Sequence, residues 1–186
     1  FPNGGMLEGL AGASYRTQND GGPFYATSGL ENRASDYVAR ARLMPTGWLE
    51  FLGRGRFAQD DGAVRFMDLS TTVSLGSGTS LTGGYLYTPA VPYLTPVQDR
   101  NEVAVGFNQR LGNWRFGAFA RYDIELNRPV VITASAGYED ECFLLEARFL
   151  KRFAEDPSTN SLYPANTVLL FRIGLKTIGD VGFRAI

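Results

Sequence analysis

The side chains of this sequence that could carry out chemistry are mainly carboxylates and arginines. Acids gather at two places in the chain: Asp123, Glu125, Glu139, Asp140 and Glu141. Paired carboxylates can act as general acid and base, or can bind a divalent cation. Both groups fall where turns are expected, however, and solvated acids are ordinary in turns. We therefore favour a turn role over a catalytic or metal site.

Histidine is absent from the sequence, and the only cysteine is Cys142. Without histidine the chain lacks the commonest general base and the commonest metal ligand, so a hydrolase would need an unusual catalytic group. One cysteine allows neither a disulfide within the chain nor a thiolate metal cluster. Cys142 is then either a free thiol that packs as a small apolar residue or half of a disulfide to another segment. We predict no enzyme, no metal and no cofactor.

The charged residues are nearly balanced, with 18 Lys and Arg against 19 Asp and Glu. A surface that follows a phosphate backbone needs a clear basic excess, so we predict no nucleic-acid partner. The arginines could still bind phosphates in bidentate fashion, or they could pair with acids along a ladder. These arginines are Arg40, Arg42, Arg54, Arg56, Arg115, Arg121, Arg148, Arg152 and Arg172. The balance of signs favours the ladder, with Asp36, Glu50, Asp68, Glu102 and Glu146 as partners.

These side chains lie in segments where apolar and polar residues alternate with a period of two. Between 143 and 153, for example, Phe143, Leu145 and Phe149 alternate with Glu146, Arg148 and Arg152. This period is typical of β-strands, and no apolar run approaches the roughly 18 residues of a membrane-spanning helix. About ten strands are predicted: 6–16, 33–44, 48–59, 64–75, 80–88, 100–110, 114–124, 128–138, 142–153 and 166–177.

The connections between these strands differ in length. Four are tight turns: 45–47, 76–79, 111–113 and 139–141. The others comprise three long polar loops (17–32, 89–99 and 154–165) and two short connections (60–63 and 125–127). Tight turns at one end and longer loops at the other are typical of outer-membrane barrels.

The composition of the two strand faces favours a membrane barrel over a soluble one. One face carries aromatics, Ala and Gly, a surface that lipid accepts, and the other carries long charged side chains. Charges that point into a small sealed core would be very costly unless paired, whereas they cost little in a wide, wet barrel. Aromatics such as Trp48, Trp114 and Tyr122 lie near strand ends, as in interfacial girdles. We predict an all-β, antiparallel transmembrane β-barrel segment; a soluble ligand-binding barrel would instead stay soluble without detergent.

Four segments resemble the C-terminal part of the barrel in the LPS-assembly outer-membrane family LptD, also called the organic solvent tolerance family. They are 136–143 (AGYEDECF), 29–37 (GLENRASDY), 121–128 (RYDIELNR) and 171–179 (FRIGLKTIG). The resemblance runs from about residue 7 to about residue 180. It implies a bacterial outer-membrane protein that works in lipopolysaccharide transport and assembly. The alternative function is a free-standing small outer-membrane barrel that acts as a pore or an adhesin.

The resemblance also implies a barrel of about 26 strands behind a periplasmic β-jellyroll domain. Residues 1–186 would be the C-terminal portion of this barrel, with the jellyroll and the first strands absent. The lack of an initiator Met and of a signal peptide agrees with such a piece. The implied partners are lipopolysaccharide, an LptE-like plug lipoprotein in the lumen, a periplasmic LPS-bridge protein and outer-membrane lipid. Cargo would enter the outer leaflet through an opening between the first and last strands.

The family places a cysteine pair at 141–142 that bonds to the N-terminal region. Here Glu141 replaces the first cysteine, so the resemblance implies a single disulfide from Cys142 to the missing region. Residues 167–177 would form the last strand, beside the opening. The lumen-facing side chains that could contact cargo or plug are Arg148, Arg152, Arg172 and Lys176.

Overall fold

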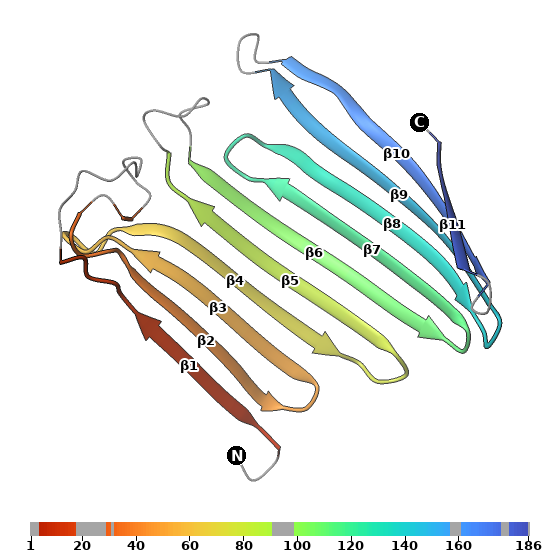
Figure 1. Cartoon of the computed structure of the whole chain (residues 1–186), viewed down its shortest axis with the longest axis horizontal. Helices are drawn as coiled ribbons and strands as arrows, with labels where there is room; N and C mark the ends of the chain where they lie inside the picture. Colours follow the sequence, from red (N-terminus) through yellow and green to blue (C-terminus); the bar gives the residue numbers. More distant parts are fainter. Residues whose placement is uncertain are drawn as a thin grey trace. The chain divides into compact units, whose positions relative to one another are not determined.

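The structure, a computed structural model, describes residues 4–17, 29–30, 32–90, 99–156, 161–175 and 179–185. It contains eleven strands: β1 (Met6–Gly12), β2 (Tyr37–Thr46), β3 (Leu49–Phe57), β4 (Val64–Ser74), β5 (Thr79–Thr88), β6 (Arg100–Leu111), β7 (Trp114–Asp123), β8 (Arg128–Glu139), β9 (Phe143–Asp156), β10 (Ser161–Leu175) and β11 (Gly179–Ala185). The strands form one sheet in the order β1 to β11, so each strand neighbours the next in sequence (Figure 1). The predicted all-β, antiparallel fold is confirmed.

The end of the chain differs from the prediction. The structure has an eleventh strand, β11, which pairs with β10 along Leu169 to Leu175. The prediction that residues 167–177 form the last strand is therefore wrong, because β11 follows them in the sheet. The sequence hides β11 because its seven residues include two glycines and show only a short alternation, Val181 and Phe183.

Several strand ends also differ from the prediction. The predicted long loop 154–165 is largely strand, because β9 extends to Asp156 and β10 begins at Ser161. At the other end of the chain, β1 stops at Gly12 and β2 begins only at Tyr37. Between β1 and β2, Tyr15 and Ala34 form an isolated antiparallel bridge.

The contacts group the chain into two compact units. Unit 1 comprises Phe1–Thr71 and Gly84–Glu102, and unit 2 comprises Thr72–Gly83 and Val103–Ile186. In unit 1, Leu10 of β1 lies opposite Arg40 of β2, and Arg40 lies opposite Arg54 of β3. In unit 2, antiparallel pairing links β7 to β11, with register shifts between Arg121 and Tyr122 and between Tyr163 and Asn166.

Very few apolar side chains are buried in this sheet. Among the described residues, the buried apolar ones are Ala58 and Val168. A soluble domain of this length would bury most of its large aliphatic side chains in a core. The sheet instead leaves its large apolar side chains exposed or only half-buried, so its apolar surface needs another medium to cover it. Within the described residues, no helix is long and apolar enough to cross a membrane.

Candidate functional site

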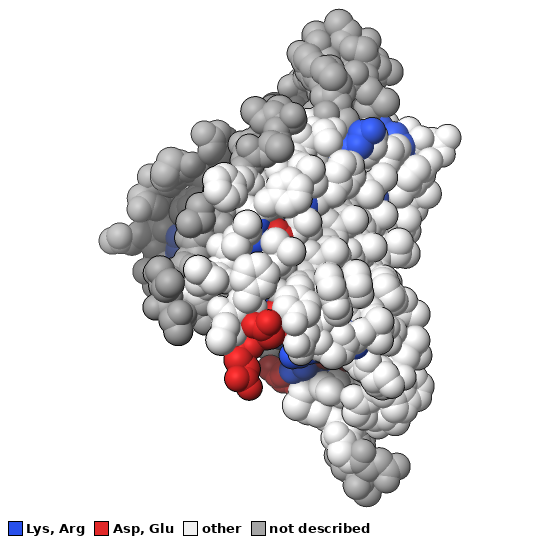
Figure 2. Space-filling view, turned by 90° about the vertical axis from the view of Figure 1, so that its right-hand side faces the viewer, with Lys and Arg blue, Asp and Glu red and all other residues white. Residues whose placement is uncertain are grey.

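The alternation of side chains gives the sheet an apolar face and a polar face. In unit 2 the apolar face is built from exposed large side chains on neighbouring strands: Val105, Phe107, Trp114, Phe116, Tyr122, Ile132, Leu145, Phe171, Ile173 and Phe183. Figure 2 shows a broad surface of largely uncharged residues, with charged side chains mainly at its margins. This surface has the chemistry of lipid chains, and lipid can cover it without a protein core.

Aromatic side chains mark both ends of the apolar face in unit 2. At the tight-turn end, the ring of Trp114 stacks on Phe116 with centroids 6.1 Å apart and meets Tyr138 edge-on at 5.1 Å. At the other end of β7, the Tyr122 hydroxyl donates a hydrogen bond to Asn127 Oδ1 at 2.6 Å. The eight residue steps from Trp114 to Tyr122 span roughly 26 Å along the strand. Because strands of outer-membrane barrels tilt by about 35–45°, this segment would rise roughly 20 Å along the membrane normal, which is most of the apolar band of about 25 Å.

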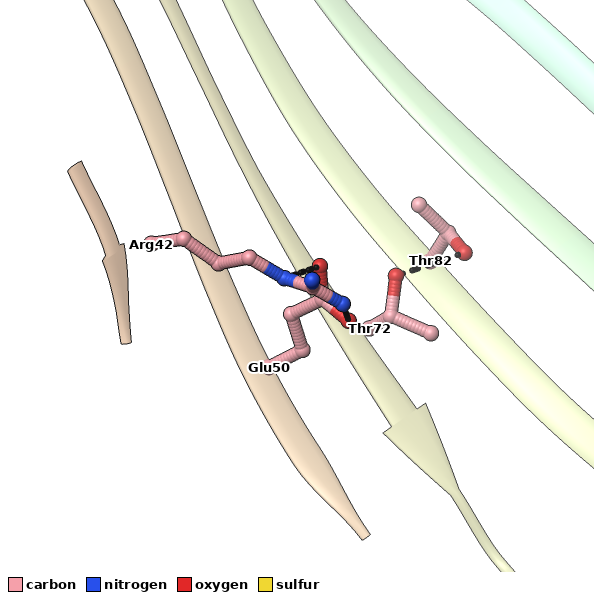
Figure 3. A network of polar contacts seen from close by, with 4 residues as sticks. All are labelled: Arg42, Glu50, Thr72 and Thr82. Atoms are coloured by element: carbon pink, nitrogen blue, oxygen red, sulfur yellow. Dashed lines mark hydrogen bonds and ion pairs between the residues drawn. The ribbon is translucent and has the colours of Figure 1, made fainter. Parts of the chain in front are cut away.

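The polar face of unit 1 carries ion pairs between neighbouring strands. Arg42 of β2 donates two hydrogen bonds to the Glu50 carboxylate of β3, at 2.9 and 3.0 Å (Figure 3). Arg54 pairs with Asp68 of β4, and Arg56 lies 3.4 Å from Asp36. The side chains of these pairs are partly exposed to solvent. Each pair therefore orients its two side chains but contributes little to the stability of the fold.

The polar face of unit 2 carries ion pairs between strands and within one strand. Arg115 of β7 pairs with Glu139 of β8 at 2.6 Å, and Arg148 pairs with Glu146 on the same strand at 2.8 Å. Arg172 of β10 lies directly opposite Glu146 in the register. In unit 1, Glu102 is almost fully buried and pairs with Arg100 at 2.6 Å. All five acids predicted for the charge ladder therefore pair with an arginine, but Glu102 pairs with Arg100, which was not among the predicted arginines, and the pairs of Glu102 and Glu146 lie within one strand.

Two hollows lie on the polar face of unit 2. The larger has a volume of about 540 Å³ and contacts Arg148 and Arg152. The smaller, of about 430 Å³, contacts Arg148 and Arg172. The structure thus places three of the four predicted contact residues on one face, with Arg148 shared by both hollows. Lys176, the fourth, lies outside the described residues.

The expectation for Arg172 requires one correction. Its strand, β10, was expected to border the opening between the first and last strands. In the structure β10 pairs with β9 on one side and β11 on the other, so Arg172 lies inside the sheet. The short, glycine-containing β11 occupies the position that the sequence assigned to β10.

Small residues line the hollows, with Ser135 in both and Gly117 in the larger, and the sequence did not single them out. A Cβ atom at Gly117 would lie 2.8 Å from Ser135 Oγ and 3.3 Å from Asn108 Oδ1. Gly117 of β7 thus lets the side chains of β6 and β8 approach each other across it. The alternation placed these residues on the polar face, but polarity alone does not reveal a depression.

Two of the clustered carboxylates, Asp123 and Asp140, hydrogen-bond to the backbone of turns, whereas Glu139 pairs with Arg115. Asp140 accepts hydrogen bonds from the backbone N–H groups of Cys142 at 2.9 Å and Phe143 at 2.7 Å. Asp123 is buried and accepts the N–H of Leu126 at 3.0 Å. Among the described residues, no group of His, Cys, Asp and Glu could hold a metal ion. The turn interpretation is confirmed at Asp140; Asp123 also bonds to a turn, but it is buried and not solvated as expected.

Cys142 is exposed at the tight turn between β8 and β9. Its Sγ has no disulfide partner among the described residues, and the turn around it is held by the Asp140 hydrogen bonds. The thiol is therefore accessible to a partner that approaches the tight-turn end of the sheet.

The comparison with protein families gives one match: the chain is similar to the family LptD, LPS transport system D, over residues 2–116. This covers more than half of the chain and includes β1 to β6. A comparison with curated proteins gives no match.

Proposed function

Because this chain belongs to the LPS transport system D family, we propose that it forms part of the wall of the outer-membrane barrel that inserts lipopolysaccharide into the outer leaflet. The family is a non-enzymatic transport family of the outer membrane, so the chain serves lipopolysaccharide transport and not catalysis. In this proposal the apolar face contacts membrane lipid and the polar face lines the lumen.

The observation that carries the proposal is the combination of two opposite faces with almost no buried apolar side chain. A sheet of this kind is stable when lipid covers one face and water or a hydrated partner covers the other. The paired arginines and acids suit a wet lumen, since their charges need not be buried. The tight turns then lie at the periplasmic end, and the long connections lie at the cell surface.

We extend the proposal to the organisation of the whole protein. Residues 1–186 would be the C-terminal portion of the barrel, preceded by a periplasmic jellyroll and by further strands. Eleven strands are far fewer than the family's barrel of about 26, and barrel diameter grows with strand number. An LptE-like lipoprotein would fill the lumen, and a periplasmic LPS-bridge protein would bind the jellyroll.

In the lumen, we assign cargo or plug contacts to Arg148, Arg152, Arg172 and Lys176. The supporting geometry is the pair of hollows on the polar face, which Arg148 joins. An arginine at a hollow can hold a phosphate or a carboxylate with two parallel hydrogen bonds.

The proposal is tested with a photo-crosslinking amino acid at two neighbouring positions of the natural gene product in cells. Thr133 lies on the polar face, and Ala134 lies on the apolar face of the same strand. We expect Thr133 to crosslink lipopolysaccharide in transit, so its product should disappear when lipopolysaccharide synthesis is blocked. Ala134 should crosslink resident membrane lipid, and its product should persist. The proposal would be contradicted if Thr133 never crosslinked lipopolysaccharide in cells in which Ala134 crosslinked membrane lipid.

Cys142 provides a separate test of the proposed N-terminal region. We expect Cys142 to form a disulfide with that region, because the exposed thiol lies at the periplasmic end of the sheet and the periplasm is oxidising. Non-reducing gels of the full-length protein should then show a mobility shift that dithiothreitol and Cys142→Ser both abolish. If oxidised and reduced wild-type protein migrate alike, Cys142 is a free thiol.

A further inference from the structure

Two arginines lie directly opposite each other on the polar face of unit 1. Arg40 of β2 and Arg54 of β3 are cross-strand partners in the register. Both residues are exposed, and the Arg54 side chain keeps 55% of its surface accessible. Like charges directly opposite each other destabilise a strand pair, so this arrangement favours a neighbouring negative charge.

The acids around this pair neutralise only part of its charge. Arg54 pairs with Asp68. Within the described part of the chain, Arg40 makes no ion pair or side-chain hydrogen bond. Glu50 is close enough to Arg40 for an electrostatic attraction, but both of its carboxylate oxygens accept hydrogen bonds from Arg42. One guanidinium of the pair thus keeps its five N–H donors available for an anion.

Apolar side chains surround these guanidinium groups. A hollow of about 400 Å³ is lined by Leu10, Val38 and Phe66 together with Arg40, Arg54 and Arg56. Leu10 lies opposite Arg40 in β1 and is 63% exposed, and Val38 is 44% exposed. Exposed aliphatic side chains next to an incompletely neutralised arginine pair form an amphipathic surface, with apolar and cationic parts side by side.

We propose that the Arg40–Arg54 pair is a binding site for a phosphate group of a glycolipid, whose apolar part lies on Leu10 and Val38. This inference rests on the proposed function, in which the polar face meets lipopolysaccharide. A phosphate matches the donors of Arg40 in bidentate geometry, and its charge offsets the cross-strand repulsion. A carboxylate of a plug protein would satisfy the charge, but it would leave the apolar lining uncovered unless an apolar side chain came with it.

The test uses the full-length gene product with a photo-crosslinking amino acid at Val38. In vitro, the probes are purified lipopolysaccharide and the same material after enzymatic dephosphorylation. We expect the phosphorylated probe to crosslink and Arg40→Gln to lower the yield by at least about tenfold, because the substitution removes a charge-assisted bidentate contact. The matched control is the double variant Arg42→Gln/Glu50→Gln, which removes a neighbouring, mutually satisfied pair without a net change in charge. Its yield should stay at the wild-type level.

Arg40→Gln also removes a like-charge pair, so this variant should fold at least as well as the wild type. The phosphate site would be overturned if Arg40→Gln and wild type gave equal yields, or if the two probes did. The proposed function would still stand in that case, provided that Thr133 crosslinks lipopolysaccharide. A Val38 product that contains protein instead of lipid would overturn it in favour of a plug contact. Loss of lipid crosslinks from both Val38 and Thr133 would instead count against the proposed function itself.

Discussion

Ala134→Arg should prevent most of the protein from assembling in the outer membrane. Ala134 lies opposite Ala118 at the middle of the apolar face, halfway between Trp114 and Tyr122 on the neighbouring strand. An arginine on the lipid face costs about 2–4 kcal/mol near the bilayer midplane, because its charge leaves water. This is a large share of the stability of a typical domain, which is about 5–15 kcal/mol. The measurement is the amount of heat-modifiable, folded barrel in outer membranes, followed by urea unfolding of the variant in lipid vesicles.

Thr133→Arg is the matched control for this variant. It introduces the same side chain at the adjacent position of the same strand, but on the polar face, where Thr133 lies opposite Phe119. Here the arginine should stay hydrated, so assembly and unfolding should remain close to wild type. If both variants assemble equally well, lipid does not cover the face that carries Trp114 and Tyr122. If Thr133→Arg alone fails, the two faces have been assigned the wrong way round.

Gly78→Ala should destabilise the tight turn between β4 and β5 and its contact with β6. Gly78 has a left-handed backbone with φ of 76°, and its carbonyl accepts the N–H of Arg110 at 2.9 Å. A Cβ atom there would lie only 2.9 Å from both Cβ and the carbonyl oxygen of Arg110. The left-handed strain costs about 1–2 kcal/mol, and the clash with backbone adds about 1–3 kcal/mol. We expect a clear decrease in the urea midpoint of the refolded barrel.

Gly76→Ala separates the two parts of this cost. Gly76 has nearly the same φ, 75°, yet a Cβ atom there would meet no heavy atom within 4 Å. It should therefore show only the backbone strain, and a smaller decrease in the urea midpoint than Gly78→Ala. Equal midpoints for the two variants would mean that the contact between Gly78 and Arg110 contributes nothing.

The sequence determined the faces of the strands with good accuracy. Alternation over 114–122 put Trp114 and Phe116 on one side and Arg115 on the other, and the register of β7 with β8 agrees. It also identified acids that pair with arginines across neighbouring strands, such as Glu50 with Arg42 and Asp68 with Arg54. The family resemblance then supplied the outer-membrane setting, which the match over residues 2–116 supports.

The strand β11 could not be predicted in the same way. Its alternation is too short to be distinguished from a loop, and pairing with β10 is what makes it a strand. The depression at Gly117 was also missed, because it depends on how closely Ser135 and Asn108 approach from the strands on either side.

The sequence by itself determined which residues share a face, and the tertiary structure alone decided which residues lie opposite one another. The reason is the two-residue period of a strand: a slip of two residues preserves every face but changes every cross-strand partner. In the observed register Arg40 lies opposite Arg54, although a slip of two would set it opposite Leu52 or Arg56. Turn geometry and the pairing of neighbouring strands fix that choice. The two-faced sheet of an outer-membrane transport protein is therefore written in the sequence, whereas the arginine pair proposed as a phosphate site exists only in the assembled sheet.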